Sequence, residues 1–254
     1  MVNTDTDSLT NSKINQSSKN DTKQLCIKNV KNDINNRFMI CHQNIRGLKG
    51  KINEFLLSLS AEVPHLICFT EQHHLKDYEL VNIHIPKYKL GANYCRKNLK
   101  QGGICIYVCE YLTFTNIDLL KYNKEHDIEI AVIELNTQKR KVIIICIYRA
   151  PCGNFECFLN KLEIILNSLH KCNSEFIICG DIIINYLEFN NKKNQLDNLL
   201  GTYNLSGTVL FPTRIVSISV TLIDNIDIDN RRTYIKPCSN GLLDHDGQTV
   251  TLFN

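Results

Sequence analysis

The chain has 254 residues, of which 43% are hydrophobic and 22% are charged, and its 29 basic and 26 acidic residues leave a net charge of +3. This composition is typical of a soluble globular protein with one large domain or two small ones. No apolar run approaches the roughly 20 residues that cross a bilayer, and the polar start of the chain lacks the apolar segment of a secretory signal. We therefore expect an intracellular protein, nuclear or cytoplasmic, with no membrane partner. The nearly balanced charge permits a nucleic-acid partner without requiring one.

Twelve cysteines could suggest disulfides, but their placement favours reduced thiols. Where cysteine lies inside an apolar, strand-like run it acts as a small buried hydrophobe. Five cysteines lie in such runs: Cys41, Cys68, Cys105, Cys146 and Cys179. No pair has the C-x-x-C spacing of a zinc motif. Reduced structural thiols are typical of a cytosolic or nuclear compartment.

The first part of the chain divides into a leader and the start of a domain. Residues 1–36 are polar and aperiodic, which predicts a disordered leader before a domain that covers residues 37–254. Within that domain, residues 51–62 carry apolar side chains at helical spacing, which predicts an amphipathic helix. Short apolar runs predict five strands, at residues 37–43, 65–70, 102–108, 127–135 and 141–149.

The second part of the chain continues this alternation. Asn154 is a suitable N-cap for a longer helix, and residues 176–179 form another buried run. A shorter helix is expected around residues 196–200, and two last strands near 221–226 and 247–253. Eight or more strands with only about three helices give a ratio of strands to helices that is too high for a doubly wound sheet. We predict an α/β fold, a four-layer sandwich of two packed mixed β-sheets flanked by helices.

Polar residues stand where these apolar runs end. They are Asn44, Glu71, Tyr148, Asp181, Asp224 and the neighbouring pair Asp244 and His245. Each has an ordinary explanation when taken alone, such as a solvated loop acid, a core tyrosine with a bonded hydroxyl, or a turn cap. Loops at strand ends, however, are held by a rigid scaffold and often carry chemistry. Together the residues predict an active site at one end of the sandwich.

The residue types in this set suit phosphodiester hydrolysis. Glu71 and Asp244 offer the oxygen ligands that Mg²⁺ prefers, and Mn²⁺ would accept them as well. A histidine paired with an aspartate can neutralise or protonate developing charge. A further carboxylate can activate water, and an amide or a phenol can hold a phosphate oxygen.

Eight segments, taken in chain order, carry a specific resemblance. They read QNIRGL, PHLICFTE, GGICIYV, IYRAP, ICGD, FPTRI, TLIDNI and LLDHDGQ. This series resembles the endonuclease/exonuclease/phosphatase superfamily, which has the deoxyribonuclease I-like fold, and especially the apurinic-type endonuclease domain of insect non-LTR retrotransposons. The resemblance implies a monomeric domain that nicks DNA. It also implies that a complete element carries a reverse transcriptase domain, which is not among these residues.

The resemblance also implies a role for each residue of the set. Glu71 and Asp244 match metal-binding positions, and Asn44 matches the asparagine near the metal. Tyr148 matches the tyrosine that contacts the scissile phosphate. Asp181 matches the aspartate that positions or deprotonates the attacking water. Asp224 matches the aspartate that orients the catalytic histidine, and His245 matches that histidine.

The sequence departs from the family pattern at two motifs. Where the family has G-D-F-N, this chain has Gly180, Asp181, Ile182 and Ile183. The isoleucine at position 183 has no side-chain group to hold a nucleophile or a phosphate, and Asn185 would replace the missing amide only if the loop changed register. Leu243 likewise replaces the serine of S-D-H.

Two main hypotheses follow. The first is a Mg²⁺-dependent DNA endonuclease, weakened by Ile183, that nicks a strand to prime reverse transcription. The second is a catalytically inactive DNA-binding or orphan domain. A phosphoinositide or sphingolipid phosphodiesterase on the same fold is a third reading, because fold alone does not determine substrate.

Overall fold

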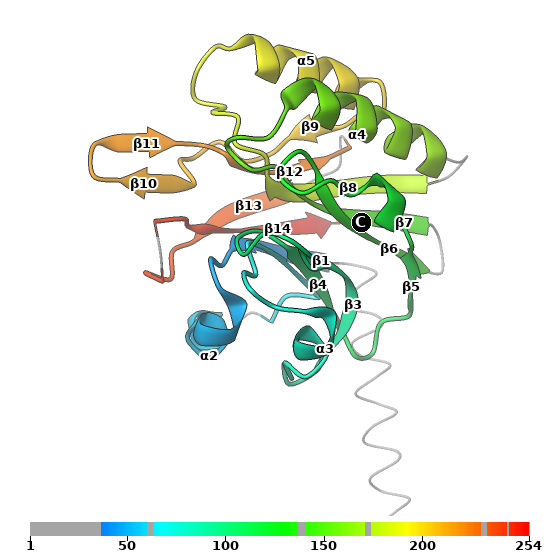
Figure 1. Cartoon of the computed structure of the whole chain (residues 1–254), viewed down its shortest axis with the longest axis vertical. Helices are drawn as coiled ribbons and strands as arrows, with labels where there is room; N and C mark the ends of the chain where they lie inside the picture. Colours follow the sequence, from blue (N-terminus) through cyan, green and yellow to red (C-terminus); the bar gives the residue numbers. More distant parts are fainter. Residues whose placement is uncertain are drawn as a thin grey trace, which may run out of the picture.

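The computed structural model describes residues 37–59, 63–136, 141–170, 174–229, 233–242 and 244–253. The predicted leader, residues 1–36, and Leu243 lie outside the described residues. Two six-stranded sheets pack face to face (Figure 1), as the sequence predicts. The first sheet has the strand order β13 (Thr233–Cys238), β14 (Gly247–Phe253), β1 (Arg37–Asn44), β2 (Leu66–Thr70), β4 (Ile104–Cys109) and β3 (Tyr88–Tyr94).

The second sheet has the order β5 (Phe114–Ile117), β6 (Glu129–Asn136), β7 (Lys141–Tyr148), β8 (Ser174–Asp181), β12 (Asp224–Ile228) and β9 (Ser206–Gly207). Each sheet is mixed, because β1 with β2 and β7 with β8 are parallel pairs while the other pairs are antiparallel. A separate hairpin, β10 (Arg214–Val216) and β11 (Ser219–Thr221), projects from one side of the sandwich (Figure 1).

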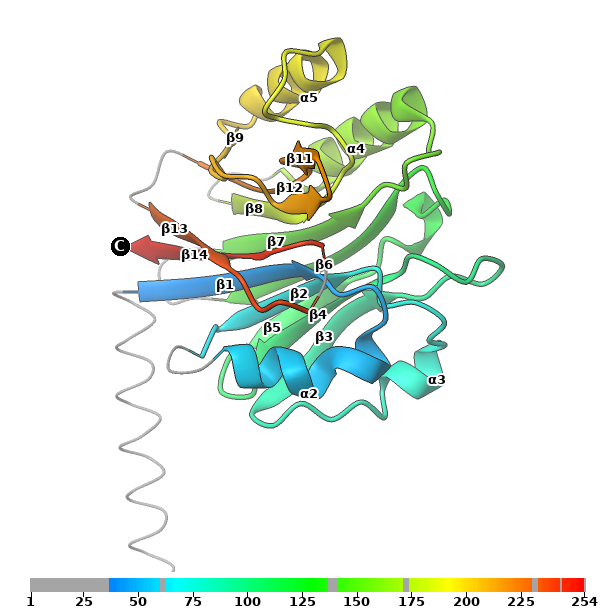
Figure 2. The same cartoon turned by 90° about the vertical axis from the view of Figure 1, so that its left-hand side faces the viewer.

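Helices cover the outer face of each sheet, which completes four layers (Figure 2). Helices α2 (Leu48–Ser58) and α3 (Asp77–Leu80) pack on the first sheet, and α4 (Phe155–Leu169) and α5 (Asn191–Gly201) pack on the second. A 3₁₀ turn, η1 (Leu120–Tyr122), lies beside β6. No helix in the described part of the chain is long and apolar enough to cross a membrane.

The central strands are apolar on both faces because both faces are buried. In β7, Ile144 and Cys146 point into the core between the sheets, whereas Ile143 and Ile145 pack against α4 and α5. The cysteines that the sequence places in strands are buried there, and the cysteines among the described residues are free thiols.

Local signals located the helices well but not their ends. Asn154 is the N-cap of α4, as predicted, and its side chain accepts a hydrogen bond from the backbone N–H of Cys157 at 2.9 Å. Helix α2 begins at Leu48, before the predicted start at residue 51, and α5 extends well beyond the predicted residues 196–200. The single strand predicted at residues 221–226 is divided, because Thr221 ends β11 and Asp224 begins β12.

Strands β3, β5, β9 and β13, helix α3 and most of the hairpin were not predicted. Strands β3, β5, β9 and β13 are the edge strands of the two sheets, and the residues of β5, β9 and β13 are half-exposed or exposed. Such strands lack the continuous apolar runs of the central strands. The predicted list was therefore limited to the buried centres of the sheets.

Candidate active site

The carboxyl ends of four strands meet at one edge of the sandwich. Asn44 is the last residue of β1, and Glu71 directly follows its parallel neighbour β2. In the second sheet, Tyr148 ends β7, and Asp181 ends its parallel neighbour β8. Parallel neighbours finish on the same side, so each sheet presents two polar residues at this edge.

Antiparallel pairing brings the remaining residues to the same edge. Asp224 begins β12 and stands opposite Asp181 in the register of β8 and β12. Strand β14 runs antiparallel to β1, so the residues that precede it, Asp244 and His245, come beside the end of β1. The predicted convergence of these residues at one end of a two-sheet sandwich is what the structure contains.

Three hydrogen bonds join the two sheets at this edge. The amide nitrogen of Asn44 donates to Asp181 Oδ2 at 2.9 Å, and the Tyr148 hydroxyl donates to Glu71 Oε1 at 2.8 Å. His245 Nδ1 lies 2.9 Å from Asp224 Oδ2. The site is thus assembled across the interface between the sheets.

Asp181, Asp224 and His245 form a compact buried cluster. One ligand atom from each lies within 4.8 Å of the others, and both aspartates have no exposed surface. Burial, and then the negative charge of Asp224, raise the pKa of Asp181 well above its usual range. Burial lowers the pKa of His245, but the hydrogen bond and the charge of Asp224 outweigh it, so that the net pKa is raised.

Glu71 and Asp244 are joined by an arginine. Arg46 Nη1 lies 2.6 Å from Asp244 Oδ1, and Arg46 Nε lies 3.5 Å from Glu71 Oε2. Glu71 also accepts a hydrogen bond from His73 at 3.0 Å, and Asp244 is bound by Arg214 at 2.8 Å. This edge therefore combines two carboxylates with two arginines and a histidine.

These partners keep both carboxylates ionised. Burial raises the pKa of Glu71, but the hydrogen bonds from His73 and Tyr148, with the charge of Arg46, lower it to about 2. Burial also raises the pKa of Asp244, but the Arg214 hydrogen bond and the Arg46 charge lower it overall. At neutral pH Glu71 and Asp244 are therefore ionised, and their carboxylate oxygens can serve as ligands for a cation.

The loop after β8 has an unusual backbone at Ile183. Its φ is 51°, in the left-handed region, which is strained for a β-branched residue and common for asparagine. The Ile183 N–H donates to Asp181 Oδ1 at 3.2 Å. The buried side chain of Arg149 donates to the carbonyl oxygens of Ile182 at 2.9 Å and Ile183 at 3.0 Å. The backbone thus keeps a shape that suits asparagine while the residue is isoleucine.

The residues around Ile183 explain the long apolar run in the sequence. Ile182 and Ile184 are buried in the core between the second sheet and its helices. Asn185 does not take the place of an amide at position 183, because its Oδ1 accepts from the N–H of Leu187 at 3.2 Å and of Leu222 at 3.1 Å. The departure at Leu243 lies outside the described residues.

No protein-family model matches the sequence, and no curated protein is similar to it in a sequence search. Solved structures are similar in fold. The endonuclease domain of TRAS1, a telomere-specific non-LTR retrotransposon, superposes with a TM-score of 0.68, covering 85% of this chain and 98% of that domain at 13% identity. The chain has the deoxyribonuclease I-like fold.

Other proteins with this fold are also similar. The human Nocturnin catalytic domain has a TM-score of 0.59 and 14% identity, covering 86% of this chain and 94% of its own. An AP endonuclease from Archaeoglobus fulgidus has a TM-score of 0.58 and 14% identity, with 85% and 99% covered. The resemblance inferred from the sequence motifs is confirmed at the level of the deoxyribonuclease I-like fold, which is what identities this low establish.

The residues at the edge of this deoxyribonuclease I-like sandwich fit a hard divalent cation. Glu71 and Asp244 come from different loops of the first sheet, and one guanidinium already contacts both of them. The Asn44 side-chain oxygen faces the same loop, where it accepts from the Arg46 N–H at 3.3 Å. Carboxylate and amide oxygens are the ligands that Mg²⁺ and Mn²⁺ prefer.

Sequence reasoning missed the cationic and supporting residues of the site. Arg46 lies in the QNIRGL segment, and Thr213 and Arg214 lie in FPTRI, so the quoted motifs contained them without a role. Thr213 is buried, and its hydroxyl accepts from the N–H groups of Ile223 and Asp224, both at 3.1 Å. It thereby positions the first residue of β12. The motifs themselves were the signal that could have identified these residues.

Proposed function

We propose that this domain is a divalent-metal-dependent DNA endonuclease whose rate is reduced by Ile183. The observation that supports it most is the set of three hydrogen bonds that cross between the sheets. They bring to one edge the carboxyl groups of Glu71 and Asp181, a histidine–aspartate pair, a tyrosine and an asparagine. Those residue types, held together, supply the groups needed to hydrolyse a phosphodiester.

The proposed roles follow from the contacts of each side chain. Glu71 and Asp244 would hold Mg²⁺ or Mn²⁺, which when bound supplies Lewis-acid stabilisation of phosphate charge. The Tyr148 hydroxyl donates its one proton to Glu71, and it would turn to a phosphate oxygen when Glu71 binds the metal. The Asn44 amide donates to Asp181 and keeps that carboxylate aimed at the edge where a phosphate would bind.

His245 and the buried Asp181 have different proposed roles in proton transfer. The raised pKa of His245 favours its charged form, because Asp224 stabilises an imidazolium. A charged imidazole beside a phosphate stabilises the developing negative charge. The raised pKa of Asp181 disfavours its ionised form, so this carboxyl can accept a proton from an attacking water only after it has lost its own.

DNA is the substrate that the site's surroundings favour. Arg46 and Arg214 are each about one-third exposed, with 33% of the side-chain surface accessible, beside the two acids. Such cations attract phosphate backbones without reading sequence. The hairpin that carries Arg214 extends the same edge into solvent (Figure 1). In a retrotransposon, the nick would leave a 3′-hydroxyl that primes reverse transcription.

Ile183 is the reason to expect weak activity. Losing one preorganised hydrogen-bond donor at a centre where charge develops typically lowers the rate by about 10²–10³. Its backbone N–H still bonds to Asp181, so an asparagine at this position would need no rearrangement of the loop. Ile183→Asn is therefore the variant expected to restore function.

The test is nicking of supercoiled plasmid in Mg²⁺. We expect the native chain to nick feebly and Ile183→Asn to nick about 10²–10³ times faster, with both abolished by EDTA. In the repaired background, Glu71→Ala should abolish nicking. Ile164→Asn, the same substitution on the exposed face of α4, is the matched control and should leave the rate of the native chain unchanged.

The outcomes separate the two candidate functions. If Ile183→Asn does not nick while both proteins shift DNA in a gel, the domain is a non-catalytic DNA-binding module and the endonuclease proposal is wrong. If the native chain nicks as fast as the repaired one, position 183 has no catalytic part. If Glu71→Ala leaves the nicking rate of the repaired chain unchanged, the assignment of Glu71 as a metal ligand is wrong.

A further inference from the structure

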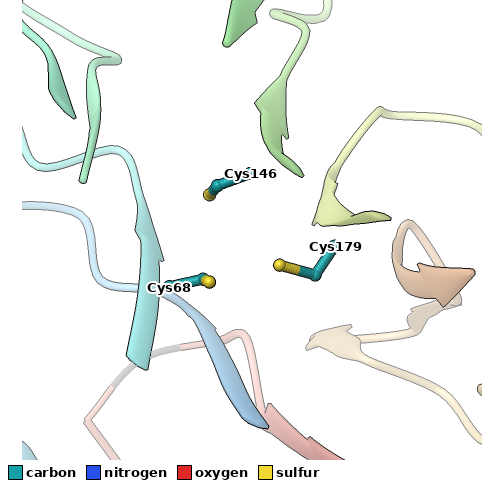
Figure 3. A group of neighbouring side chains, drawn as sticks. All are labelled: Cys68, Cys146 and Cys179. Atoms are coloured by element: carbon teal, nitrogen blue, oxygen red, sulfur yellow. The ribbon is translucent and has the colours of Figure 1, made fainter. Parts of the chain in front are cut away.

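A second set of metal-ligating side chains lies in the core directly beneath the candidate active site. Cys68, Cys146 and Cys179 come from β2, β7 and β8, and their sulfur atoms all lie within 4.8 Å of one another. Figure 3 shows the three side chains pointing toward one another from separate strands. None has any exposed surface.

The period of the strands places this cluster one layer below the catalytic residues. Side chains two residues apart on a strand share a face. Cys146 therefore shares a face with Tyr148, and Cys179 shares one with Asp181. Cys68 stands in the same relation to Thr70, the residue before Glu71. The three cysteines therefore lie one layer of side chains deeper in the core than the residues of the active-site edge.

A histidine completes the layer. His42 precedes Asn44 by two residues on β1 and stands beside Cys68 in the parallel register of β1 and β2. In the opposite sheet Cys146 and Cys179 are register partners. One sheet thus contributes a histidine and a cysteine, and the other contributes two cysteines. Cys146 reaches across the interface, because its sulfur lies 3.8 Å from the backbone oxygen of Phe69 on β2.

The contacts of His42 leave a ring nitrogen that can bind a metal. His42 is fully buried, and Nδ1 lies 2.8 Å from Gln248 Oε1. The Gln248 amide nitrogen donates to the carbonyl of Asp246, so Oε1 is the atom that faces the imidazole and accepts from Nδ1. Nε2 then carries the lone pair, and its contact is the Thr70 hydroxyl at 3.3 Å. Metal-binding histidines usually donate their other ring N–H in this way.

We propose that Cys68, Cys146 and Cys179 form a buried zinc site. His42 lies outside this group of three and would become the fourth ligand after its ring turns from Thr70 toward the sulfurs. Three sulfurs and one imidazole nitrogen are a ligand set of structural zinc sites, which are closed to solvent. On binding, each thiol loses its proton to solvent and its sulfur forms a bond to zinc. The ion would tie the two sheets together beneath the active-site edge.

The absence of the usual motif does not argue against this site. Zinc motifs are recognised by short spacings between ligands, but here each ligand comes from a different strand. Register within a sheet and packing between sheets bring them together instead. The ordinary alternative is three cysteines that act only as small buried hydrophobes.

Cobalt substitution distinguishes these readings. The full chain is unfolded in chelator and reductant, refolded, and titrated with Co²⁺. We expect an equimolar complex with a sulfur-to-cobalt charge-transfer band and the visible bands of tetrahedral Co²⁺, both removed by Zn²⁺. Zinc should also raise the melting temperature of the apo chain, and a chelator should reverse that rise.

Variants identify the ligands. Cys179→Ala, or the closer mimic Cys179→Ser if the first does not fold, should lose the charge-transfer band and the thermal shift. His42→Ala should keep sulfur bands but bind at least about 10-fold more weakly. Cys105→Ala is the matched control, because Cys105 is equally buried but faces the α2 side of the first sheet, and it should behave as the native chain.

Two results would overturn the zinc site. One is the absence of a sulfur-to-cobalt band in the refolded native chain. The other is a band that persists unchanged in the Cys179 variants. Co²⁺ held by Glu71 and Asp244 has oxygen ligands and gives no such band, so the zinc site and the endonuclease proposal fail independently.

Discussion

The loops that follow β2 and β8 carry equivalent parts of the candidate site in opposite sheets, yet they differ in how well their residues suit their backbones. Both hold residues in the left-handed region. After β2 these are Glu71, His73 and His74, with φ between 50° and 55°, and after β8 the residue is Ile183, with φ 51°. Histidine is found in this region several-fold more often than most residues, whereas a β-branched residue there is an outlier.

The difference shows two ways to hold a strained loop. The β2 loop is held by many bonds of ordinary kinds, both local and long-range. His73 bonds to Glu71 within the loop, the Tyr148 hydroxyl donates to Glu71 from the other sheet, and the N–H groups of Gln72 and His73 donate to the carbonyls of Gly103 and Gly102. In the β8 loop, the support comes from another strand end, where buried Arg149 donates to two loop carbonyls and to the carbonyl of Gly153. A loop supported from outside can keep its shape after its own sequence has changed.

A large loss of stability is expected when that outside support is removed. Arg149→Met leaves three backbone carbonyls without their donor and should lower the free energy of unfolding by about 3 kcal/mol. Arg214→Met is the matched control, because that arginine is partly exposed and its ion pair should contribute about 1 kcal/mol or less. Urea unfolding of both variants measures the difference. Similar losses for the two arginines would show that Arg149 does not support the loop.

The β2 loop should be the acid-sensitive one. The pKa of Glu71 falls from 4.5 to about 2 on folding, so the unfolded chain binds this proton more readily. The resulting stability, up to about 3 kcal/mol, is fully present above pH 4.5 and is lost as the pH falls toward 2. The measurement is unfolding free energy against pH for the native chain and Glu71→Gln.

The expected pattern is a difference between these two proteins that shrinks as the pH falls through that window. His73→Leu, which removes one of the donors to Glu71, should show a shallower slope than the native chain. A difference that is constant with pH would contradict the assigned pKa.

Substitution of Ile183 should change the stability of the β8 loop as well as the activity of the domain. Ile183→Asn should raise the free energy of unfolding by about 1 kcal/mol, because relief of left-handed strain of about 1–2 kcal/mol exceeds the packing energy of a half-buried isoleucine side chain. Ile182→Asn should do the opposite and cost about 2–5 kcal/mol, since Ile182 is buried in the helix-side core. Equal signs for the two neighbours would show that the strain at Ile183 is unimportant.

The smallest effect concerns the histidine that lies outside both loops. The raised pKa of His245 depends on Asp224, so a titration followed by NMR should give a value above 6.5, and Asp224→Asn should lower it. The pair stabilises the fold fully below the unfolded pKa of His245, and this contribution is lost as the pH rises through the folded value. A native pKa at or below the ordinary value would contradict the pairing.

The sequence by itself determined the features that depend on neighbouring residues. Apolar runs located the central strands, and Asn154 located the start of α4. The polar residues that follow those runs indicated the residues of the candidate site. These signals are local, because strand burial, helix capping and strand termination depend on residues a few positions apart. Edge strands such as β5 and β13 were not predicted because half-exposed strands lack such a run.

Only the tertiary structure decided which of these ends meet. Asn44 bonds to Asp181 across 137 residues of sequence, and Tyr148 bonds to Glu71 across 77. Sheet order and register bring such pairs together, and no local pattern encodes them. The same holds for the arginine between the two acids, the left-handed backbone at Ile183, and the cysteines that meet beneath the site. Each depends on elements distant in sequence, and sheet packing alone places them side by side.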